Sequence, residues 1–505
     1  MVGSFLPLLI IATYHYMRAW TFPVSVDAAS TTPLFLQIAR AISDDVTRGR
    51  LHPGDPLPGT RTLADELGVH RATIVAAYEE LIAQGWATAR SGHATTIAPT
   101  SPDVLETSRR PRAPHAPRGM GFDLAPVAGE RILAPPAITR ASTISLWGGV
   151  PDTRLIDLDA VGRALRRATR THGRSLLRYA DDPRGHPALR TALASMLAAS
   201  RGLAVTADDV LVTNGSQQAL DLAAHALLRP GDAVAIEALG YRPAWAALRR
   251  AGAELLAIPV DAEGLRTAEL SALLRRRRIR AVYVTPHHQY PTTVVMSPRR
   301  RAALLELARV HRFAIVEDDY DHEFHFEGRP ILPIASTDRS GQVIYVGGLA
   351  KSVAPGLRTG YIVAPPAALA RLAEERAISD RHGMRIAEAA VAELLDDGHL
   401  QRHVRRARRI YLERRDALAT ALRKKLGDKL AFDVPAGGLT LWARADGIDV
   451  EAWRERAERA GVLVQSGKSF AFDGSRVPCL RLGFAAGTPR ELAQAVDILA
   501  TTFRR

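Results

Sequence analysis

From about Leu146 onward, short apolar segments alternate with longer amphipathic segments, and this alternation limits the possible folds more than any other feature. Val210–Thr213 and Phe313–Val316 are strand-like runs, and segments with helical spacing lie between such runs. Strands that alternate with helices are typical of α/β domains with a mostly parallel central sheet. The sequence therefore predicts an α/β domain over residues 146–505.

The first 145 residues do not follow this alternation. Residues 99–145 are rich in proline and arginine and have little periodicity, which predicts a linker. Within residues 1–30, the apolar run Phe5–Ala12 is too short to cross a bilayer, and no basic segment of a signal peptide precedes it. We therefore expect no membrane partner and interpret residues 1–30 as a disordered or misassigned start, with Met17 as a possible initiator.

Residues 31–98 have the spacing of three short helices followed by a hairpin. We expect Thr32 to cap the first helix, with Pro33 at its first position, and Thr60 to cap the second. Gly68 ends the second helix, and the third is expected to bury Ile74, Tyr78, Leu81 and Ile82. Two helices joined by a tight glycine turn indicate a helix-turn-helix, whose second helix enters the DNA major groove.

Four segments of this unit closely resemble the GntR-type winged helix: Pro33–Ile38, Gly49–Pro58, Arg61–Gly68 and Ala77–Gly85. The resemblance implies a domain that binds a double-stranded DNA operator. His70 replaces the usual serine, and the expected wing tip Gly92–Thr96 departs from the usual Gly-Arg-Gly-Thr. We expect six side chains to contact DNA, namely Thr60, Arg61, His70, Arg71, Thr73 and His93.

Net charge alone does not support DNA binding. The chain carries a formal charge of +14, but residues 33–98 contain six arginines and seven acidic side chains. The basic excess therefore lies mostly in the large domain, where an arginine-rich surface can simply be solvated.

Lys351 is one of only five lysines among 67 basic side chains, and it follows the apolar run Val343–Val346. A lysine at a strand end often extends its amine to solvent. An amine is required, however, where a Schiff base forms, since a guanidinium cannot lose its proton. The neighbouring motifs decide between these interpretations.

Acidic and aromatic residues follow the strand Phe313–Val316, in the segment Glu317–Asp321. Pyridoxal phosphate needs a lysine for its aldehyde and a carboxylate against its pyridine nitrogen. Asp318 and Tyr320 lie two residues apart and share one side of an extended segment. Mg²⁺ binding is the alternative for such a cluster, but the chain has no Walker-type loop to accompany it. We therefore expect no metal site.

Phosphate donors are expected where the strand Val210–Thr213 leads into a helix. Backbone amides of Gly215, Ser216 and Gln217 and the Ser216 hydroxyl can hold an anion there. Arg358 can pair with the phosphate, and Tyr241 can stack on the pyridine ring.

Over most of residues 146–505, these motifs resemble fold-type I aminotransferases, which have a smaller C-terminal α/β subdomain. Matching segments are Tyr179–Gly185, Thr213–Gln217, Thr285–Pro291, Glu317–Tyr320, Lys351–Tyr361 and Leu480–Phe484. The resemblance implies an aldimine at Lys351, contact of Asp318 with the pyridine nitrogen and of Tyr320 with O3′, and carboxylate binding by Arg481. The tyrosine matching Tyr179 reaches the partner's cofactor, which implies a homodimer.

Two departures concern cofactor contacts. Gly348 and Ala350 stand where serine or threonine usually precedes the lysine, and the usual asparagine before Pro291 is absent. We expect His288 or Gln289 to substitute for that asparagine.

The two resemblances together are typical of MocR/GabR-like regulators, which join a GntR-type head to an aminotransferase-like domain. They imply a cytoplasmic regulator that senses a small amino compound or B6 vitamer through Lys351; the single cysteine, Cys479, fits a reducing compartment. One alternative is an active aminotransferase with an accessory head. Another is a DNA-binding protein whose large domain serves only for dimerisation.

Overall fold

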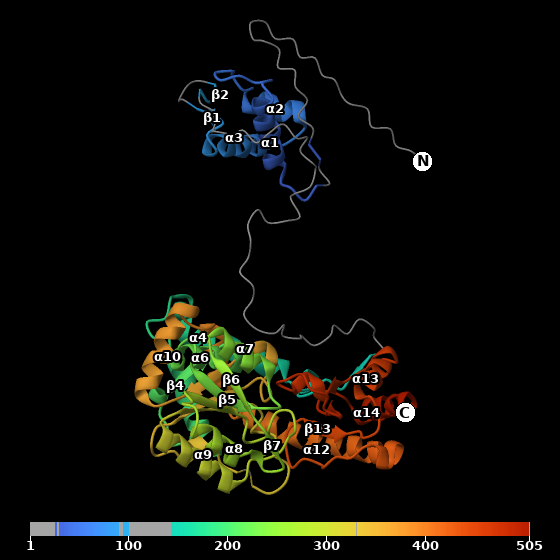
Figure 1. Cartoon of the computed structure of the whole chain (residues 1–505). Coiled ribbons are helices and arrows are strands. Elements are labelled where there is room, and N and C mark those ends of the chain that lie inside the picture. The colour runs from blue at the N-terminus through green and yellow to red at the C-terminus, as the bar shows by residue number, and fades with distance from the viewer. Residues whose placement is uncertain (1–25, 28–29, 90–93, 100–142, 330, 504–505) are drawn as a thin grey trace. The chain divides into compact units, whose positions relative to one another are not determined.

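The computed structural model describes residues 26–27, 30–89, 94–99, 143–329 and 331–503. The chain divides into two compact units, Met1–Leu124 and Ala125–Arg505 (Figure 1). Nearly all of the expected N-terminal segment 1–30, most of the expected linker 99–145, and His93 lie outside the described residues.

The first unit is a winged helix-turn-helix. Helices α1 (Leu34–Thr47), α2 (Thr60–Leu67) and α3 (Arg71–Ala83) precede a ribbon of β1 (Ala87–Thr88) and β2 (Thr96–Ile97). The two strands are antiparallel, with Ala87 opposite Ile97. Apolar side chains from all three helices and both strands form one core, which includes Ile38, Ile42, Leu63, Ile74, Leu81 and Ile97.

Three local expectations for this unit were wrong. Pro33 is the N-cap of α1 rather than its first residue, and Gly59 rather than Thr60 is the N-cap of α2. Thr60 is the first helical residue, so its side chain is free to contact other groups. Ile82 is 39% exposed, because the buried stripe of α3 runs through Ile74, Ala77, Tyr78 and Leu81 and leaves Ile82 at its edge.

The second unit contains a seven-stranded sheet in the order β4-β12-β11-β10-β9-β5-β6. Only β12 runs against its neighbours, so the sheet is mostly parallel, as expected. Its strands are β4 (Val210–Thr213), β5 (Ala233–Glu237), β6 (Glu254–Ile258), β9 (Ala281–Val284), β10 (Ala314–Asp319), β11 (Val343–Gly348) and β12 (Gly360–Val363).

Helices cover both faces of this sheet (Figure 1). One face packs on α6 (Ser216–Leu227), α7 (Arg242–Arg250) and α10 (Pro366–Ser379). The core of the other face includes residues of α4 (Leu158–His172), α5 (Pro187–Arg201), α8 (Thr267–Leu274), α9 (Pro298–His311) and α11 (Arg385–Asp396). Strand residues alternate between the cores: Val282 and Val284 face one, Ala281 and Tyr283 the other.

A smaller α/β subdomain completes the second unit. The strand order is β13 (Thr440–Arg444), β16 (Cys479–Gly483) and β15 (Gln465–Ser466), all antiparallel. Its core includes residues of α12 (His399–Leu426), α13 (Val450–Arg459) and α14 (Pro489–Thr502). Strand β14 (Val462–Leu463) pairs in parallel with β3 (Ile144–Ser145), and β7 (Val260–Asp261) pairs with β8 (Gly264–Leu265).

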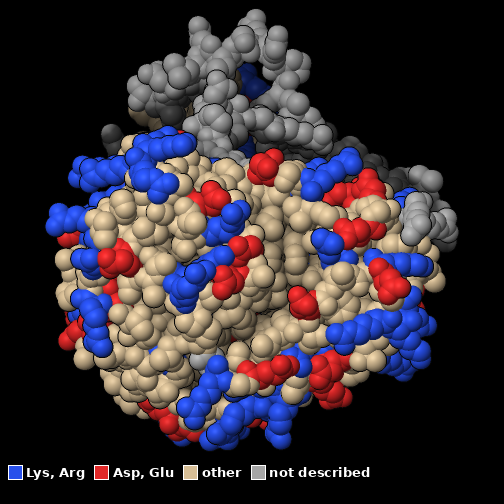
Figure 2. Space-filling view, turned by 60° about the horizontal axis from the view of Figure 1, so that its bottom comes forward, with Lys and Arg blue, Asp and Glu red and all other residues tan. Residues whose placement is uncertain are grey.

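No helix within the described ranges is both long and apolar enough to span a bilayer. On the face of the large unit in Figure 2, basic and acidic side chains are interspersed around a mostly uncharged middle.

Leu81→Ala should destabilise the winged helix by about 2–5 kcal/mol, because Leu81 is fully buried and its loss leaves a cavity. Hydrogen exchange of α3 amides in the full-length chain measures this as a lower opening free energy. Ile82→Ala, one residue along the same helix, is the control and should change exchange by less than about 1 kcal/mol. Equal effects of the two variants would contradict the assigned core.

Candidate functional site

The candidate site lies at the carboxyl edge of the large sheet. Strands β10 and β11 are parallel neighbours, with Asp318 opposite Val346. Asp318 is the penultimate residue of β10, and Lys351 follows the end of β11 by three residues. Parallel pairing therefore delivers both side chains to one edge, where open α/β sheets bind ligands.

Lys351 occupies an electrostatically unusual position. Burial lowers its pKa to about 8, helped by the positive charge of Arg481 and opposed by Asp321 and Asp318. Its Nζ donates a hydrogen bond to the carbonyl oxygen of Gly149. A sizeable fraction of this amine is therefore neutral near neutral pH, as a nucleophilic lysine requires.

Asp318 has one carboxylate oxygen that is engaged and one that is not. Tyr283 donates a hydrogen bond to Oδ2 at 2.8 Å. Oδ1 is buried and has no partner within the described part of the chain. Burial raises the Asp318 pKa to about 7, and Asp319 and Asp321 add to the shift. A buried N–H donor at Oδ1 would satisfy this carboxylate and favour its ionised form.

Arg481 is a buried cation with unused donors. It lies on β16 and is 1% exposed, and its Nε and Nη1 have no partner among the described residues. Its guanidinium lies 4.3 Å from the ring centroid of Tyr290. It also packs so closely on Gly148 that any side chain there would collide with it. These free N–H groups can donate to an anion, and the two oxygens of a carboxylate can pair with two nitrogens of a planar guanidinium.

Gly215 and Arg358, both expected to hold the phosphate, lie next to each other. Gly215 is the N-cap of α6 with φ 80°, and a Cβ there would lie 2.8 Å from Arg358 Nη2. Arg358 donates to the carbonyl oxygen of Asn214 at 3.0 Å. Gly360 packs on the Gly215–Ser216 backbone too closely for a side chain. The helix start, the Ser216 hydroxyl and the guanidinium can together hold a phosphate.

Aromatic rings line the space between these groups. The Tyr290 ring is edge-to-face with those of Tyr241 and Tyr320, with centroids 5.3 and 5.9 Å apart. Tyr320 donates a hydrogen bond to the carbonyl oxygen of His288 at 2.9 Å. Tyr290 and Tyr283 were not among the expected site residues. The alternation of β9, which points Tyr283 to the same side as Asp318, was the available signal for Tyr283.

Three expected cofactor contacts have other partners. Gln217 donates to Pro243 O at 2.9 Å, whereas its Oε1 is buried without a partner among the described residues. Gln289 donates to Leu239 O and accepts from Thr292. His288 contacts Asp321 through Nδ1. The Gln289 amide therefore links its own loop, through Thr292, to the segment after β5, through Leu239.

Tyr179 lies apart from this group on the surface. It is 75% exposed, and the Arg381 guanidinium lies 5.1 Å from its ring centroid. The expected role of Tyr179 in a partner's site remains a prediction.

In the winged helix, the expected DNA contacts gather at the start of α3. Arg61, His70 and Arg71 are exposed, and Thr60 and Thr73 are half-buried. Arg71 Nε donates to Thr60 Oγ1 at 3.2 Å, so the first residues of α2 and α3 are adjacent. The amides at the start of a helix also attract phosphate.

Comparison with known proteins agrees with both units. The family described as Aminotransferase class I and II matches residues 147–499, and the family of bacterial regulatory proteins, gntR, matches residues 34–97. The probable rhizopine catabolism regulatory protein MocR of Rhizobium meliloti is 32% identical over 487 residues, 95% of each chain. The transcriptional regulator TauR of Rhodobacter capsulatus is 32% identical, over 93% of this chain and 96% of its own.

Among solved structures, the multiple substrate aminotransferase of Thermococcus profundus superposes with a TM-score of 0.68 at 30% identity. The match covers 72% of this chain and 92% of that chain. The fold and site thus define a GntR-type DNA-binding regulator that carries a class I and II aminotransferase domain. The chain belongs to the MocR-like family of such regulators.

The pKa of Lys351 predicts how fast its amine reacts with an aldehyde. Only the neutral amine attacks, so the rate with added pyridoxal phosphate should rise about tenfold between roughly pH 7 and pH 9 and then level off. Stopped-flow absorbance on cofactor-free protein measures this rate, with free lysine as the reference reaction. Arg481→Gln should move the midpoint upward, since a positive charge is removed. A rate that still rises steeply beyond pH 9.5 would contradict a depressed pKa.

Proposed function

We propose that this chain is a cytoplasmic, homodimeric transcriptional regulator that holds pyridoxal phosphate at Lys351 and senses a small amino compound or B6 vitamer there. The observation that carries the proposal is the pairing of a DNA-binding head with a site in which Asp318 and Arg481 have buried, unpartnered polar atoms near the amine of Lys351. Lys351 has a depressed pKa, and Asp318 Oδ1 and Arg481 Nη1 have no partners among the described residues.

The residues present fit the cofactor. Asp318 Oδ1 would accept from the pyridine N–H, and Gly215, Ser216 and Arg358 would hold the phosphate. Tyr241 would cover one ring face. When bound, the cofactor supplies an aldehyde that forms a Schiff base with an amine. Lys351 supplies that amine, and an amino compound that enters the site competes with it.

Arg481 defines the class of effector. Its two unpartnered nitrogens lie within a buried site and can pair with a carboxylate. An effector that carries both an amine and a carboxylate would be held at Arg481 and would release Lys351. The freed ammonium would then lie beside Arg481, Asp318 and Asp321, so effector binding redistributes charge at the sheet edge. Regulation requires that this binding differ between two states of the protein.

Exposed apolar side chains support the homodimer. Leu177, Tyr179 and Met384 are each more than two-thirds exposed. Arg385 donates to the carbonyl oxygens of Ser175 and Arg178, which joins their two segments. An apolar patch of this kind typically marks a protein interface.

An active aminotransferase is the second candidate, favoured by the likeness to a solved aminotransferase at 30% identity. Turnover of an amino acid with a 2-oxo acid at roughly 1–1000 per second would support it. A regulator is expected to turn over far more slowly while its DNA affinity responds to the amino compound.

Lys351→Ala should abolish covalent attachment of the cofactor, because the amine that forms the Schiff base is removed. Gel filtration followed by absorbance should show the cofactor separating from the variant and staying with the parent protein. Lys468→Ala is the matched control, since Lys468 is an exposed lysine near Phe470, and it should retain the cofactor. Retention of the visible cofactor band by Lys351→Ala would contradict the assignment.

Arg71→Ala should weaken specific DNA binding about tenfold, since a cation at the start of the recognition helix is lost. Genomic fragments selected with the full-length chain provide the probe, and fluorescence anisotropy measures affinity at fixed salt. Arg48→Ala removes an exposed arginine at the far end of α1 and should have little effect. Cofactor absorbance should be the same in both. Equal losses in the two variants would remove Arg71 from the interface.

A further inference from the structure

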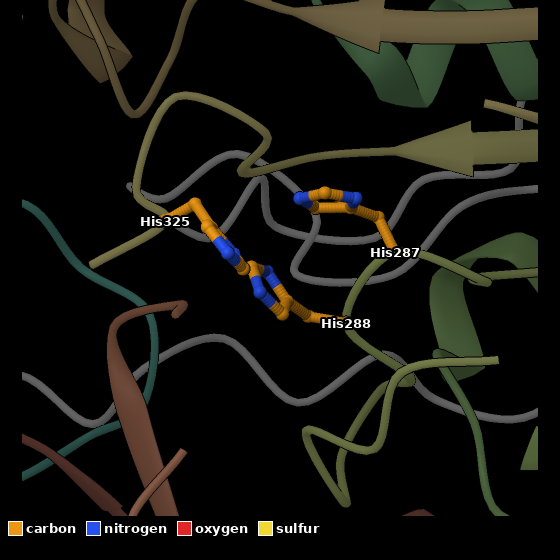
Figure 3. Close-up of side chains that lie close together, drawn as sticks. All are labelled: His287, His288 and His325. Carbon is orange, nitrogen blue, oxygen red and sulfur yellow. The ribbon is translucent and has the colours of Figure 1, made fainter. Parts of the chain in front are cut away.

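Four buried histidines lie next to the candidate cofactor site, and one of them, His288, was also expected to contact the cofactor. His287 and His288 follow β9, and His322 and His325 follow β10. All four are less than 9% exposed. The His287 ring stacks on that of His322 with centroids 4.4 Å apart and lies 4.5 Å from that of His288. Figure 3 shows His287, His288 and His325 approaching one another from these two loops.

Several ring nitrogens of this histidine cluster are buried and have no hydrogen-bond partner among the described residues. Within the described chain, no partner is found for either nitrogen of His287, for Nε2 of His288 and His322, or for Nδ1 of His325. A buried polar atom without a partner costs about 1–3 kcal/mol. Five such atoms in one place therefore indicate that something else satisfies them.

Carboxylates orient two of these rings. Asp321 lies 2.7 Å from His288 Nδ1, and Asp319 lies 2.8 Å from His322 Nδ1. A carboxylate that accepts from one nitrogen fixes the tautomer and leaves a lone pair on the other. Histidines that bind metals are usually held in this way. The unpartnered Nε2 of His288 is the nitrogen that such an arrangement presents.

We propose that His287, His288 and His325 bind a divalent transition-metal ion of the zinc class. One nitrogen from each ring lies within 4.8 Å of the others. Zinc–nitrogen bonds of about 2.0–2.1 Å place tetrahedral ligands closer together than this, so small ring movements complete the site. Three neutral imidazoles suit Zn²⁺, Ni²⁺ or Cu²⁺ better than Mg²⁺ or Ca²⁺, which prefer oxygen ligands. The sequence motifs alone led us to expect no metal.

A second group, His287, Asp319 and His322, has similar spacing. Its carboxylate is already committed, because Asp319 Oδ2 accepts from Tyr345 at 2.6 Å as well as contacting His322. Both nitrogens of His287, Nε2 of His288 and Nδ1 of His325 have no partner among the described residues, and we assign the ion to this three-histidine group.

The cluster has a route to solvent. His325 lines a surface cavity of about 830 Å³, together with Phe326 and residues of α12. Several arginines line the same cavity, among them Arg402, Arg405 and Arg408. They repel a free cation, so we expect the ion to enter slowly and long equilibration to be needed.

The test uses the full-length, tag-free protein with its cofactor bound. After dialysis against a chelator, it is equilibrated overnight with Zn²⁺, and bound zinc is counted by elemental analysis. We expect one zinc per chain. With Co²⁺ in place of Zn²⁺, visible d–d absorption of a nitrogen-ligated, tetrahedral ion should appear. No bound zinc, or Co²⁺ absorption typical of the hydrated ion, would overturn the proposal without any variant.

Two variants locate the ion. His325→Gln should weaken zinc binding at least about tenfold, because one of three ligands is lost. His322→Gln removes a buried imidazole from the same cluster and should weaken binding much less. Circular dichroism and cofactor absorbance show whether each variant is folded. Unchanged binding by folded His325→Gln, or an equal loss in His322→Gln, would overturn the three-histidine assignment.

Discussion

The placement of the half-buried Lys351 amine beside the buried Arg481 guanidinium is the constraint on which the rest of the site depends. Two cations held together out of water destabilise each other unless anions compensate them. Asp318 and Asp321 provide this compensation, and burial nevertheless lowers the Lys351 pKa to about 8. The same arrangement leaves Arg481 with unused donors for an incoming anion. The same set of neighbouring charges therefore lowers the pKa of the Lys351 amine and leaves Arg481 able to bind an anion.

Successive side chains of β10 point to opposite faces of the sheet, so Asp318 and Asp319 have different neighbours. Asp318 shares the side of Tyr283 and faces the candidate cofactor space, whereas Asp319 points the other way, to Tyr345 and His322. Two adjacent carboxylates therefore serve different sites. Tyr320 links the candidate cofactor site to the histidine cluster, because its hydroxyl donates a hydrogen bond to the backbone carbonyl of His288. An ion at the histidine cluster would hold the loops after β9 and β10 together directly behind the cofactor site.

Local sequence signals predicted the fold well wherever a period or a glycine determined the outcome. The strand and helix alternation predicted the mostly parallel sheet, and the glycine turn at Gly68 predicted the helix-turn-helix. Ile82 was misplaced because the hairpin and α1 determine which edge of α3 is covered, and helical spacing alone does not contain this information. The observed N-caps, Pro33 and Gly59, each lie one residue away from the expected caps, Thr32 and Thr60.

The site was predictable where a residue follows a strand end and less so where loops meet. Asp318 lies at the end of one strand, and Lys351 and Gly215 follow two others of the same sheet, so topology alone gathers them. Tyr290 and the four histidines lie on loops whose contacts are set by tertiary packing. His287 and His325 are 38 positions apart in the chain, and no short motif links them. Gln289 was expected to contact the cofactor, and its amide bonds to Leu239 and Thr292; its role toward the cofactor stays a prediction.

The central claim is that binding of an amino compound at Lys351 changes the DNA affinity of the winged helix. Reciprocal linkage tests it most directly. The affinity of the full-length protein for a selected genomic fragment is measured with and without saturating amino compound, and the affinity for that compound is measured with and without the fragment. The account predicts one coupling factor, of about 5–150-fold, in both directions. DNA affinity that stays the same at saturating amino compound would contradict it.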